Sequence, residues 1–186
     1  MFIRRVDESL DRMLRAELPL PIEVADVSFD APTPGWAAGV SRPTVSLFLY
    51  EVLPSRRPAQ AVGLRVDAAG QVQRRRALPM VDLNYLVSAW AATSLEEHDL
   101  LGRLASFFAG QGSVPAAHLP DDSIGDLQLF FGGDDRNQLR DIWRAAGGEL
   151  KGSFTVSLVV AADSAGWYDE APPVARVVGS VARRAE

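Results

Sequence analysis

The sequence predicts a single α/β (α+β) domain in which helices pack on one mixed β-sheet. Apolar residues recur at helical spacing in separate amphipathic segments, and extended runs rich in β-branched and aromatic residues lie between them. The 186 residues are 47% hydrophobic and 23% charged, which is ordinary for one globular domain of this length. Because the extended runs interleave with three helical segments, a mixed sheet covered by helices is the expected architecture.

The N-terminal segment predicts a helix over residues 3–18, followed by a strand. Charged residues fill much of one face of this helix, and Pro19 and Pro21 end it. Residues 22–29 alternate well enough for a strand, and residues 31–39 are expected to form a loop because they contain two prolines and two glycines. The apolar stripe of the helix consists of Ile3, Val6, Leu10, Met13 and Leu14.

A long strand and a hairpin are predicted next. Residues 43–53 are rich in β-branched and aromatic residues, and Pro43 and Pro54 bound them. Two further extended runs, AVGLRV and QVQRRRAL, flank the turn residues Asp67, Ala68, Ala69 and Gly70. A short glycine-containing loop between two extended runs predicts a β-hairpin.

The stretch VDLNYLVSAWA, residues 81–91, is predicted to be a strand. With a period of two, one face is largely apolar, whereas with a helical period the apolar residues scatter around the whole circumference. The predicted apolar face holds Val81, Leu83, Tyr85, Val87 and Ala89, and the other face holds Asp82, Asn84, Leu86, Ser88 and Trp90.

A capped helix follows this strand. Ser94 and Glu97 have the spacing of a capping box, and Gly110 is expected to stop the helix. Its apolar stripe consists of Leu100, Leu101, Leu104, Phe107 and Phe108.

The C-terminal half continues with a short strand at 126–131, a helix and a last strand at 152–162. Asp134 or Asp135 is expected to cap the helix, and Gly147 and Gly148 are expected to end it. The helix carries the apolar residues Leu139, Ile142 and Trp143.

The composition changes after Asp163, which divides the chain into a domain at 1–163 and an arm or tail at 164–186. Pro172 and Pro173 block regular structure, and valines alternate with arginines beyond them. The valines fit a helical stripe and an extended arm equally well.

Charge and hydropathy argue against nucleic acid and membrane as partners. The net charge is −5, whereas non-specific nucleic-acid binding requires an excess of lysine and arginine. No apolar run approaches the roughly 18 residues of a membrane span, so the protein is expected to be cytoplasmic. The basic run Arg74-Arg75-Arg76 is expected to be a solvated strand end, an oligomer contact or an anion-binding site. Arginine supplies 18 of the 19 basic residues, which suggests a GC-rich bacterial genome.

No motif in the sequence points to catalysis, a cofactor or a metal. His98 and His118 lack a companion at metal-ligand spacing, and there is no glycine-rich nucleotide loop or nucleophile elbow. The carboxylate pairs at 96–97, 121–122 and 134–135 fall where helix starts or loops are expected, where negative charge complements exposed amides. Hydrolases, kinases and dinucleotide-binding enzymes therefore lack their usual sequence motifs here, and we expect no cofactor and no bound metal.

The order of several segments resembles the tube-cap, or tube-terminator, family of extracellular contractile injection systems. The resemblance covers roughly residues 3–162, and the Photorhabdus virulence cassettes and the antifeeding prophage typify these particles. Its most specific pieces are DLNYLVSAWA running into EEHDLLG, and the junction WRAAGGELKGS. The segments LDRMLRAEL, VSLFLYEV and the arginine-rich hairpin accompany them in the same order.

The resemblance implies a structural protein with a fold similar to phage tail terminators. It implies a hexameric ring that closes the distal end of the inner tube and contacts the sheath. A closed ring needs two different adhesive surfaces on each subunit, and two segments are candidates: the arginine run and the C-terminal tail, which could add as a strand to a sheet edge. The expected interface residues are Arg74, Arg75, Arg76, Val174, Val177, Val178, Val181, Arg183 and Arg184.

Two alternatives remain open from sequence. One is a phage or prophage tail terminator, which would share the fold but belong to a different particle. The other is a small cytoplasmic enzyme with a pocket built around Asp82, Asn84 and Tyr85.

Overall fold

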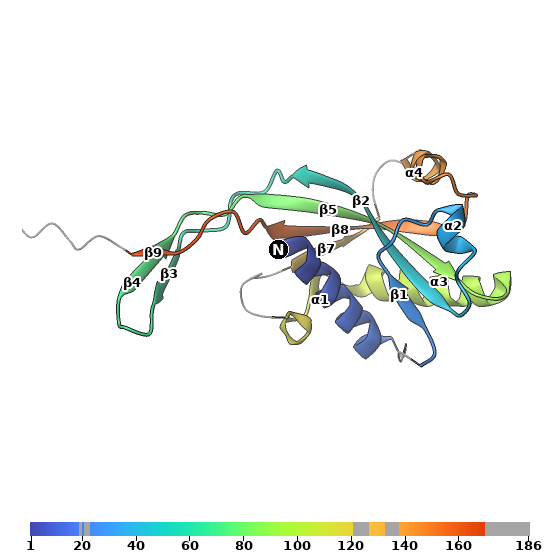
Figure 1. The fold of residues 1–186 in the computed structure, drawn as a ribbon, viewed down its shortest axis with the longest axis horizontal. Coiled ribbons are helices and arrows are strands. Elements are labelled where there is room, and N and C mark those ends of the chain that lie inside the picture. The colour runs from blue at the N-terminus through green and yellow to red at the C-terminus, as the bar shows by residue number, and fades with distance from the viewer. Residues whose placement is uncertain (19, 21–22, 121–126, 133–137, 170–186) are drawn as a thin grey trace, which may run out of the picture.

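A curled six-stranded sheet with helices against it forms the body of the molecule, and a three-stranded sheet projects from one end as an arm (Figure 1). The computed structural model describes residues 1–18, 20, 23–120, 127–132 and 138–169. The helices are α1 (Phe2–Glu17), α2 (Pro34–Ala37), α3 (Ser94–Gly110), the 3-10 turn η1 (Ala116–His118) and α4 (Gln138–Ala146). The strands are β1 (Asp26–Ser28), β2 (Thr44–Pro54), β3 (Gly63–Val66), β4 (Val72–Arg75), β5 (Met80–Trp90), β6 (Ser113–Val114), β7 (Leu127–Phe131), β8 (Ser153–Ala161) and β9 (Tyr168–Asp169).

The body sheet is mixed, as the sequence predicts. Its order is β1-β2-β5-β8-β7-β6, and the arm sheet has the order β3-β4-β9. Strand β1 pairs with β2 in parallel, whereas the other pairings are antiparallel. The long strands β2 and β5 pair along almost their whole length, with one irregularity between Leu49 and Glu51. An extra residue at such a bulge strengthens the local twist of the strand pair.

The main core lies between one face of the body sheet and the helices α1 and α3. Each helix contributes the apolar stripe that its spacing predicts, and the predicted apolar face of β5 meets these stripes. Fully buried side chains in this core are Val6, Leu10, Met13 and Leu14 of α1, Leu104 and Phe108 of α3, and Leu83, Tyr85 and Val87 of β5.

The opposite face of the sheet is covered near one end by α4 and α2 (Figure 1). Trp143 of α4 is 1% exposed, and its indole Nε1 donates a hydrogen bond to Ser153 Oγ at 3.0 Å. The ring of Trp90 lies 6.3 Å from that of Trp143 and 5.1 Å from that of Trp36. These three tryptophans form a second, smaller apolar cluster.

Helix α2 corrects the prediction of a loop over residues 31–39. Thr33 caps it by accepting a hydrogen bond from the Trp36 amide at 3.3 Å, and Pro34 occupies the first turn. Proline is favourable there because its fixed φ suits the helix and the first amides have no partner within the helix. Helix α2 has only four residues, which is too short for a helical period to appear in the sequence.

The predicted cap of α3 is wrong by one residue. Thr93, not Ser94, is the N-cap, and its side chain and that of Glu96 make the reciprocal bonds of a capping box. Both Thr93 and Ser94 are followed by a glutamate three positions later, so the motif alone does not decide between them. Glu97, the expected partner of Ser94, instead pairs with Lys151.

Other boundaries differ modestly from the predictions. Strand β1 spans three residues within the predicted 22–29, and Asp134 and Asp135 lie outside the described residues. Gly147, which follows α4, has a φ of +72°, the left-handed conformation that favours glycine at a helix end. Over the described part of the chain, no helix is both long and apolar enough to cross a membrane.

Candidate functional site

The arm is an extension of the three central strands of the body. Strand β2 leads into β3, β4 leads into β5, and β8 leads toward β9, so the strand order is the same in both sheets (Figure 1). Prolines at positions 54, 58 and 79 fall at this junction, and proline has no amide proton for a ladder. Local bonds still hold the strands together there: Gln60 and Leu78 exchange two backbone hydrogen bonds, at 2.8 and 3.2 Å.

The tip of the arm is the turn that the sequence predicts. Gly70 adopts a φ of +79°, and Asp67 accepts hydrogen bonds from the backbone amides of Ala69 and Gln71 at 2.9 and 2.8 Å. A short side-chain acceptor and a residue with free φ are what such a turn requires. The predicted hairpin is therefore confirmed.

One face of the arm is closed by Trp167. The guanidinium groups of Arg65 and Arg75 lie over its ring at 4.5 and 4.9 Å from the centroid, and a Cβ at Gly63 would stand 2.8 Å from the ring. Cation–π contacts of this kind hold an exposed ring in place. The indole therefore ties the segment before β9 to the hairpin.

Hydrogen bonds across the same face continue this arrangement. Gln73 accepts from Nε and Nη2 of Arg65 at 2.9 and 2.8 Å and donates to Asp169 at 3.0 Å. Each of the three strands contributes one partner to this chain of bonds. Arg65, Gln73 and Asp169 are thus hydrogen-bonded within the arm, whereas Arg75 Nε on the same face has no hydrogen-bond partner among the described residues.

The other face of the arm is apolar and exposed. Leu64 pairs across the sheet with Arg74, Val66 with Val72, and Arg74 with Tyr168, and directly opposed residues share a face. Leu64 and Val66 are 64% and 67% exposed, and the other two apolar members are close to half exposed. We call this surface the arm face; its members are Leu64, Val66, Val72, Arg74 and Tyr168.

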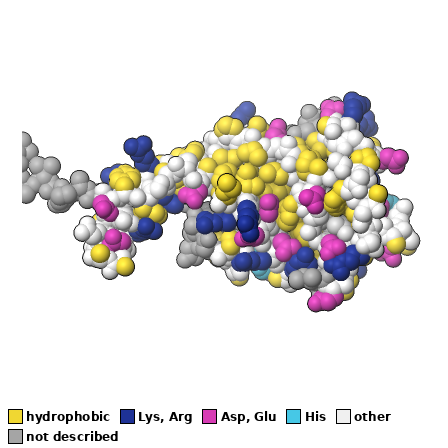
Figure 2. Space-filling model, in the orientation of Figure 1, with side chains coloured by type: hydrophobic (Ala, Val, Ile, Leu, Met, Phe, Trp, Pro, Cys, Tyr) yellow, Lys and Arg dark blue, Asp and Glu magenta, His cyan; other side chains and the backbone are white. Residues whose placement is uncertain are grey.

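Charge separates the arm from the rest of the chain. Residues 55–76 contain six arginines and one aspartate, a net charge of +5. The whole chain carries −5, so the remaining residues together carry −10. Figure 2 shows dark blue basic side chains and a few magenta carboxylates on the arm, and many magenta carboxylates together with dark blue side chains on the body.

The structure divides the predicted arginine run. Arg75 points to the face that holds Trp167, whereas Arg74 lies on the arm face, and Arg76 follows the end of β4 and is exposed. The three side chains therefore do not form one continuous basic surface. The predicted tail residues, Val174, Val177, Val178, Val181, Arg183 and Arg184, lie outside the described residues.

The side chains of the alternative enzyme pocket do not converge. Tyr85 faces the main core, where its hydroxyl donates to Asp7 at 2.8 Å. Asn84 lies on the other face, donates to Glu51 at 2.8 Å and accepts from Ser157 at 2.6 Å. Asp82 shares that face, and Asp82 and Asn84 both line a hollow of about 340 Å³ at the root of the arm, without Tyr85. A pocket built from all three residues is therefore wrong.

Burial alters the titration of the tyrosine–aspartate pair. Burial raises the pKa of Tyr85 far above its ordinary value, and the neighbouring Asp7 carboxylate adds to this. Burial also raises the pKa of Asp7, against the lowering effect of the hydrogen bond from Tyr85. The pair joins α1 to β5: Tyr85 is buried in the core, whereas Asp7 is half-buried and also lines a surface hollow of about 320 Å³.

The two family-marker segments meet in space. Lys151 of the WRAAGGELKGS junction lies over the Trp90 ring at 4.0 Å and pairs with Glu97 of EEHDLLG. A Cβ at Gly148 would stand 3.2 Å from Trp143 and 3.1 Å from the Pro32 carbonyl oxygen. These segments therefore hold α4, α3 and the end of β5 together, which gives the resemblance a structural basis.

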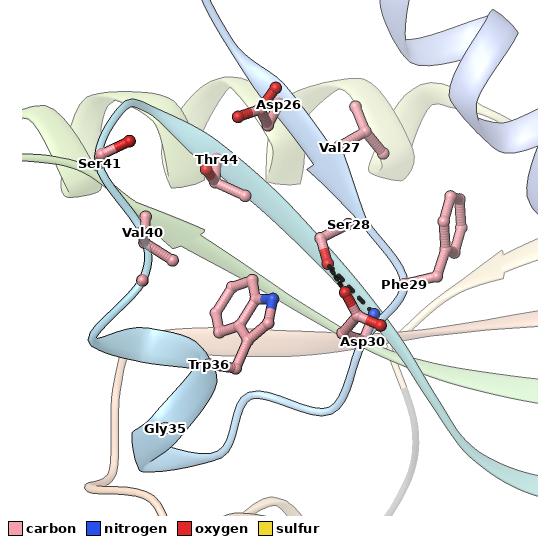
Figure 3. A pocket seen from close by; sticks show the side chains of 11 residues that line it. Asp26, Val27, Ser28, Phe29, Asp30, Gly35, Trp36, Val40, Ser41 and Thr44 are labelled. Carbon is pink, nitrogen blue, oxygen red and sulfur yellow. Dashed lines mark hydrogen bonds between the residues drawn. The ribbon is translucent and has the colours of Figure 1, made fainter.

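A hollow lies beside the edge strand β1 of the body. Its volume is about 740 Å³, and Figure 3 shows Trp36 and Val40 on one side and the residues of β1 and its continuation on the other. Asp30, at the end of this continuation, is exposed and accepts a hydrogen bond from Ser28 Oγ at 3.1 Å. We call this the β1 hollow; Trp36 and Val40 are its apolar lining, whereas Val27 and Phe29, which also border it, pack against the main core.

A salt bridge fixes the upper end of the β1 hollow. Arg42 donates to both carboxylate oxygens of Asp26, and this hydrogen bonding lowers the pKa of Asp26. Asp26 is therefore committed to a partner within the chain. Asp30 is the other carboxylate that lines the hollow.

The predicted metal and acid–base candidates are dispersed. His118 Nε2 lies 3.1 Å from Glu17 Oε1, and His98 lies on α3. Glu96 and Glu97 lie in the first turn of that helix, as expected, whereas the other two carboxylate pairs lie outside the described residues. Among the described residues, no three histidine, cysteine or carboxylate side chains gather in a way that could hold a metal ion.

Sequence reasoning missed three features of these surfaces. Trp167 falls in a segment assigned to the tail, the arm face comes from alternation in a hairpin too short to place, and the β1 hollow needs residues from two separate segments. The alternation of Leu64 and Val66 with Arg65 was a usable pattern. It did not show that the apolar side of the hairpin would remain uncovered.

The sequence of this chain matches a known protein family. Residues 5–176 match the model of the Pvc16 N-terminal domain. No curated protein matches the sequence.

Two solved structures share its fold. One, described as the PVC sheath/tube terminator of an extracellular contractile injection system in the extended state, aligns with a TM-score of 0.69 and 23% identity. That alignment covers 98% of this chain and 64% of the other. The tube-terminating cap of the anti-feeding prophage aligns with a TM-score of 0.61 and 17% identity, over 95% of this chain and 60% of the other.

The chain thus spans somewhat less than two thirds of either solved relative. Their fold includes the mixed sheet and helices described above, which confirms the predicted fold class. Because the family model matches nearly the whole chain, this protein belongs to the Pvc16 N-terminal domain family.

Proposed function

We propose that this protein is a structural cap, or terminator, subunit of an extracellular contractile injection system. In this role it closes the distal end of the inner tube and anchors the sheath. The observation that carries the proposal is the family match over residues 5–176, together with a fold shared over 98% of the chain with a protein described as a sheath/tube terminator. The role is structural and not catalytic, and the particle is assembled in the bacterial cytoplasm.

The subunits form a homo-hexameric ring. A ring around a tube requires head-to-tail contacts between two different surfaces of each subunit. Each subunit has two such surfaces, the exposed apolar face of the arm and the β1 hollow of the body, and this supports the ring.

The partners of the ring are the inner tube protein and the sheath protein. The arginine run contacts an acidic surface of the assembly, and the tail beyond residue 163 adds to a sheet edge of the sheath. The tail valines and arginines at 174–184 carry this second contact. Its starting point is the arm, because β9 pairs with β4.

Electron microscopy of the purified protein, mixed with tube and then with sheath, tests the proposal. We expect rings at one end of each tube, and tubes of uncontrolled length when the protein is omitted from assembly. Failure to bind tube ends would contradict the proposed function.

A truncation after Asp169 tests the sheath contact separately. It retains β9 and Trp167, so the arm stays intact, whereas truncation at Ala162 would remove them. We expect rings that bind the tube but do not retain sheath. Normal sheath attachment would contradict the role of the tail and leave the capping role standing.

A further inference from the structure

The two faces of the arm differ in how far their apolar side chains are covered. On the face with Trp167, Arg65 and Gln73 are hydrogen-bonded within the arm, and Arg75 lies over the Trp167 ring with its Nε unpaired within the described part of the chain. The arm face instead leaves Leu64 and Val66 about two thirds exposed on a thin three-stranded sheet. No described element of the body packs over them, because the arm projects away from it (Figure 1). An exposed apolar patch of this kind marks an interaction surface.

The charge of the arm defines the chemistry of what covers it. With a net charge of +5 over residues 55–76, a suitable partner surface is apolar at its centre and acidic at its margin. Two arm faces packed against each other would bring Arg74 of one subunit against a second basic arm. The charge therefore argues against a symmetric contact between arms.

The chain itself offers the complementary surface. The β1 hollow has an apolar lining that includes Trp36 and Val40, with the exposed carboxylate of Asp30 at its margin. Figure 3 shows Trp36 and Val40 bordering this space, with Asp30 from a separate segment facing Trp36, whereas Phe29 points away from Trp36. The residues outside 55–76 carry a net charge of −10, so the body attracts the arm of another copy.

The positions of the two surfaces suit a head-to-tail contact. The arm lies at one end of the long axis of the molecule, and β1 and α2, whose residues line the β1 hollow, lie toward the other end (Figure 1). A subunit in this arrangement cannot fill its own hollow, and contacts between unlike surfaces generate rings when the rotation closes. The edge of β1 away from β2 is also the outer edge of the body sheet.

We propose that the arm face of one subunit docks in the β1 hollow of a second copy of this chain. Leu64 and Val66 cover Trp36 and Val40 of the neighbour, and Arg74 lies near the neighbour's Asp30 position. This inference rests on the proposed ring and names the surfaces that close it. It also assigns the acidic partner of the basic arm to a neighbouring subunit.

Cysteine cross-linking tests the contact directly, because the chain contains no cysteine. Val66→Cys and Val40→Cys are introduced together, and the protein is treated with a short bismaleimide cross-linker. We expect a ladder of covalent oligomers on denaturing gels. A mixture of the two single variants is expected to give covalent dimers only.

Charge reversal provides an independent test by sedimentation or native mass spectrometry. Arg74→Glu or Asp30→Arg alone is expected to weaken association by about tenfold or more, since like charges then meet. The double reversal is expected to restore much of it. Arg144→Glu on α4, which reverses an equally exposed arginine outside both surfaces, is the matched control and is expected to leave association unchanged.

An apolar substitution completes the set. Leu64→Glu is expected to abolish ring formation, whereas Leu95→Glu, at an equally exposed leucine on α3, is expected to preserve it. Circular dichroism of each variant confirms the fold.

Several results would overturn the inference. Rings that form normally without a 40-to-66 cross-link would overturn it and leave the proposed function standing. Cross-linking of Val66→Cys to itself would indicate a symmetric arm contact, and intact Leu64→Glu rings that no longer bind tube would assign the arm face to the tube. A wild-type protein that forms no ring, even on tubes, would contradict the proposed function itself.

Discussion

The body and the arm use the same three strand directions but are stabilised in different ways. In the body, β2, β5 and β8 lie beneath helices, and side chains on both faces are buried. In the arm, two arginines of β3 and β4 contact Trp167, which precedes β9, on one face, and exposed apolar side chains lie on the other face. The body therefore folds by burying its own apolar surface, whereas the arm leaves apolar surface available.

This difference matters because a two-stranded hairpin is marginal in water without further packing. The arm gains a third strand from the segment after β8 and a ring that spans the sheet. These contacts organise the arm without covering Leu64 and Val66. The arm is thus ordered by a small number of contacts and keeps its apolar face for a partner.

The largest loss of stability is expected at the buried tryptophan of the body. Trp143→Ala removes a 1% exposed ring from the body, so the free energy of unfolding should fall by about 3–5 kcal/mol, the range for large-to-small core substitutions. Chemical denaturation monitored by circular dichroism measures this. A loss near zero would show that α4 is not part of the cooperative core.

A smaller effect is expected at the buried tyrosine of the body. Tyr85→Phe removes the hydrogen bond to Asp7, and bonds to charged groups contribute about 1.5–3 kcal/mol. Denaturation at neutral pH measures the loss. An unchanged midpoint would show that the bond contributes nothing net.

The same variant should change the response to alkaline pH. The folded-state pKa of Tyr85 is raised, so the folded protein keeps a proton that the unfolded chain releases above pH of about 10. The wild-type free energy of unfolding should therefore fall as pH rises beyond that value. Tyr85→Phe should lose this part of the dependence, and identical alkaline curves for the two proteins would contradict the prediction.

The helix cap of α3 tests a local contribution within the body. Thr93→Ala should lower the free energy of unfolding by about 1 kcal/mol, because the amide of Glu96 loses its acceptor. Ser94→Ala is the matched control and should have a much smaller effect. A larger loss of stability for Ser94→Ala than for Thr93→Ala would instead identify Ser94 as the cap, as the sequence predicts.

The smallest global effect is expected in the arm. Trp167→Ala should change the free energy of unfolding by less than about 0.5 kcal/mol, since the body core does not contact this ring. Amide exchange in Gly63–Val66 should nevertheless speed up by about tenfold or more, because local opening reports local contacts. A global loss as large as that of Trp143→Ala would show that the arm and the body fold as one unit.

Much of the body could be predicted from sequence, because its patterns repeat over many residues. The stripes of α1 and α3 and the two-residue period of β5 are confirmed, and each pattern has several members that agree. Short elements were less accessible. Helix α2 has four residues, and the choice between Thr93 and Ser94 depends on where the chain leaves β5.

The interaction surfaces were predicted less completely than the fold. The hairpin and its turn are confirmed, but the three arginines are divided between faces, and Arg75 is used to hold Trp167. The residues of the expected enzyme pocket are split by the sheet, since strand neighbours point to opposite sides. Spacing alone does not tell which face a helix will cover.

The sequence by itself determined the fold class, the family resemblance and the hairpin, because these depend on local periodicity and on the order of segments. Tertiary structure alone decided that β9 joins the hairpin, that Trp167 lies between Arg65 and Arg75, and that Leu64 and Val66 stay uncovered. The physical reason is that burial depends on contacts between segments nearly a hundred residues apart. Such contacts leave no periodic trace in either segment.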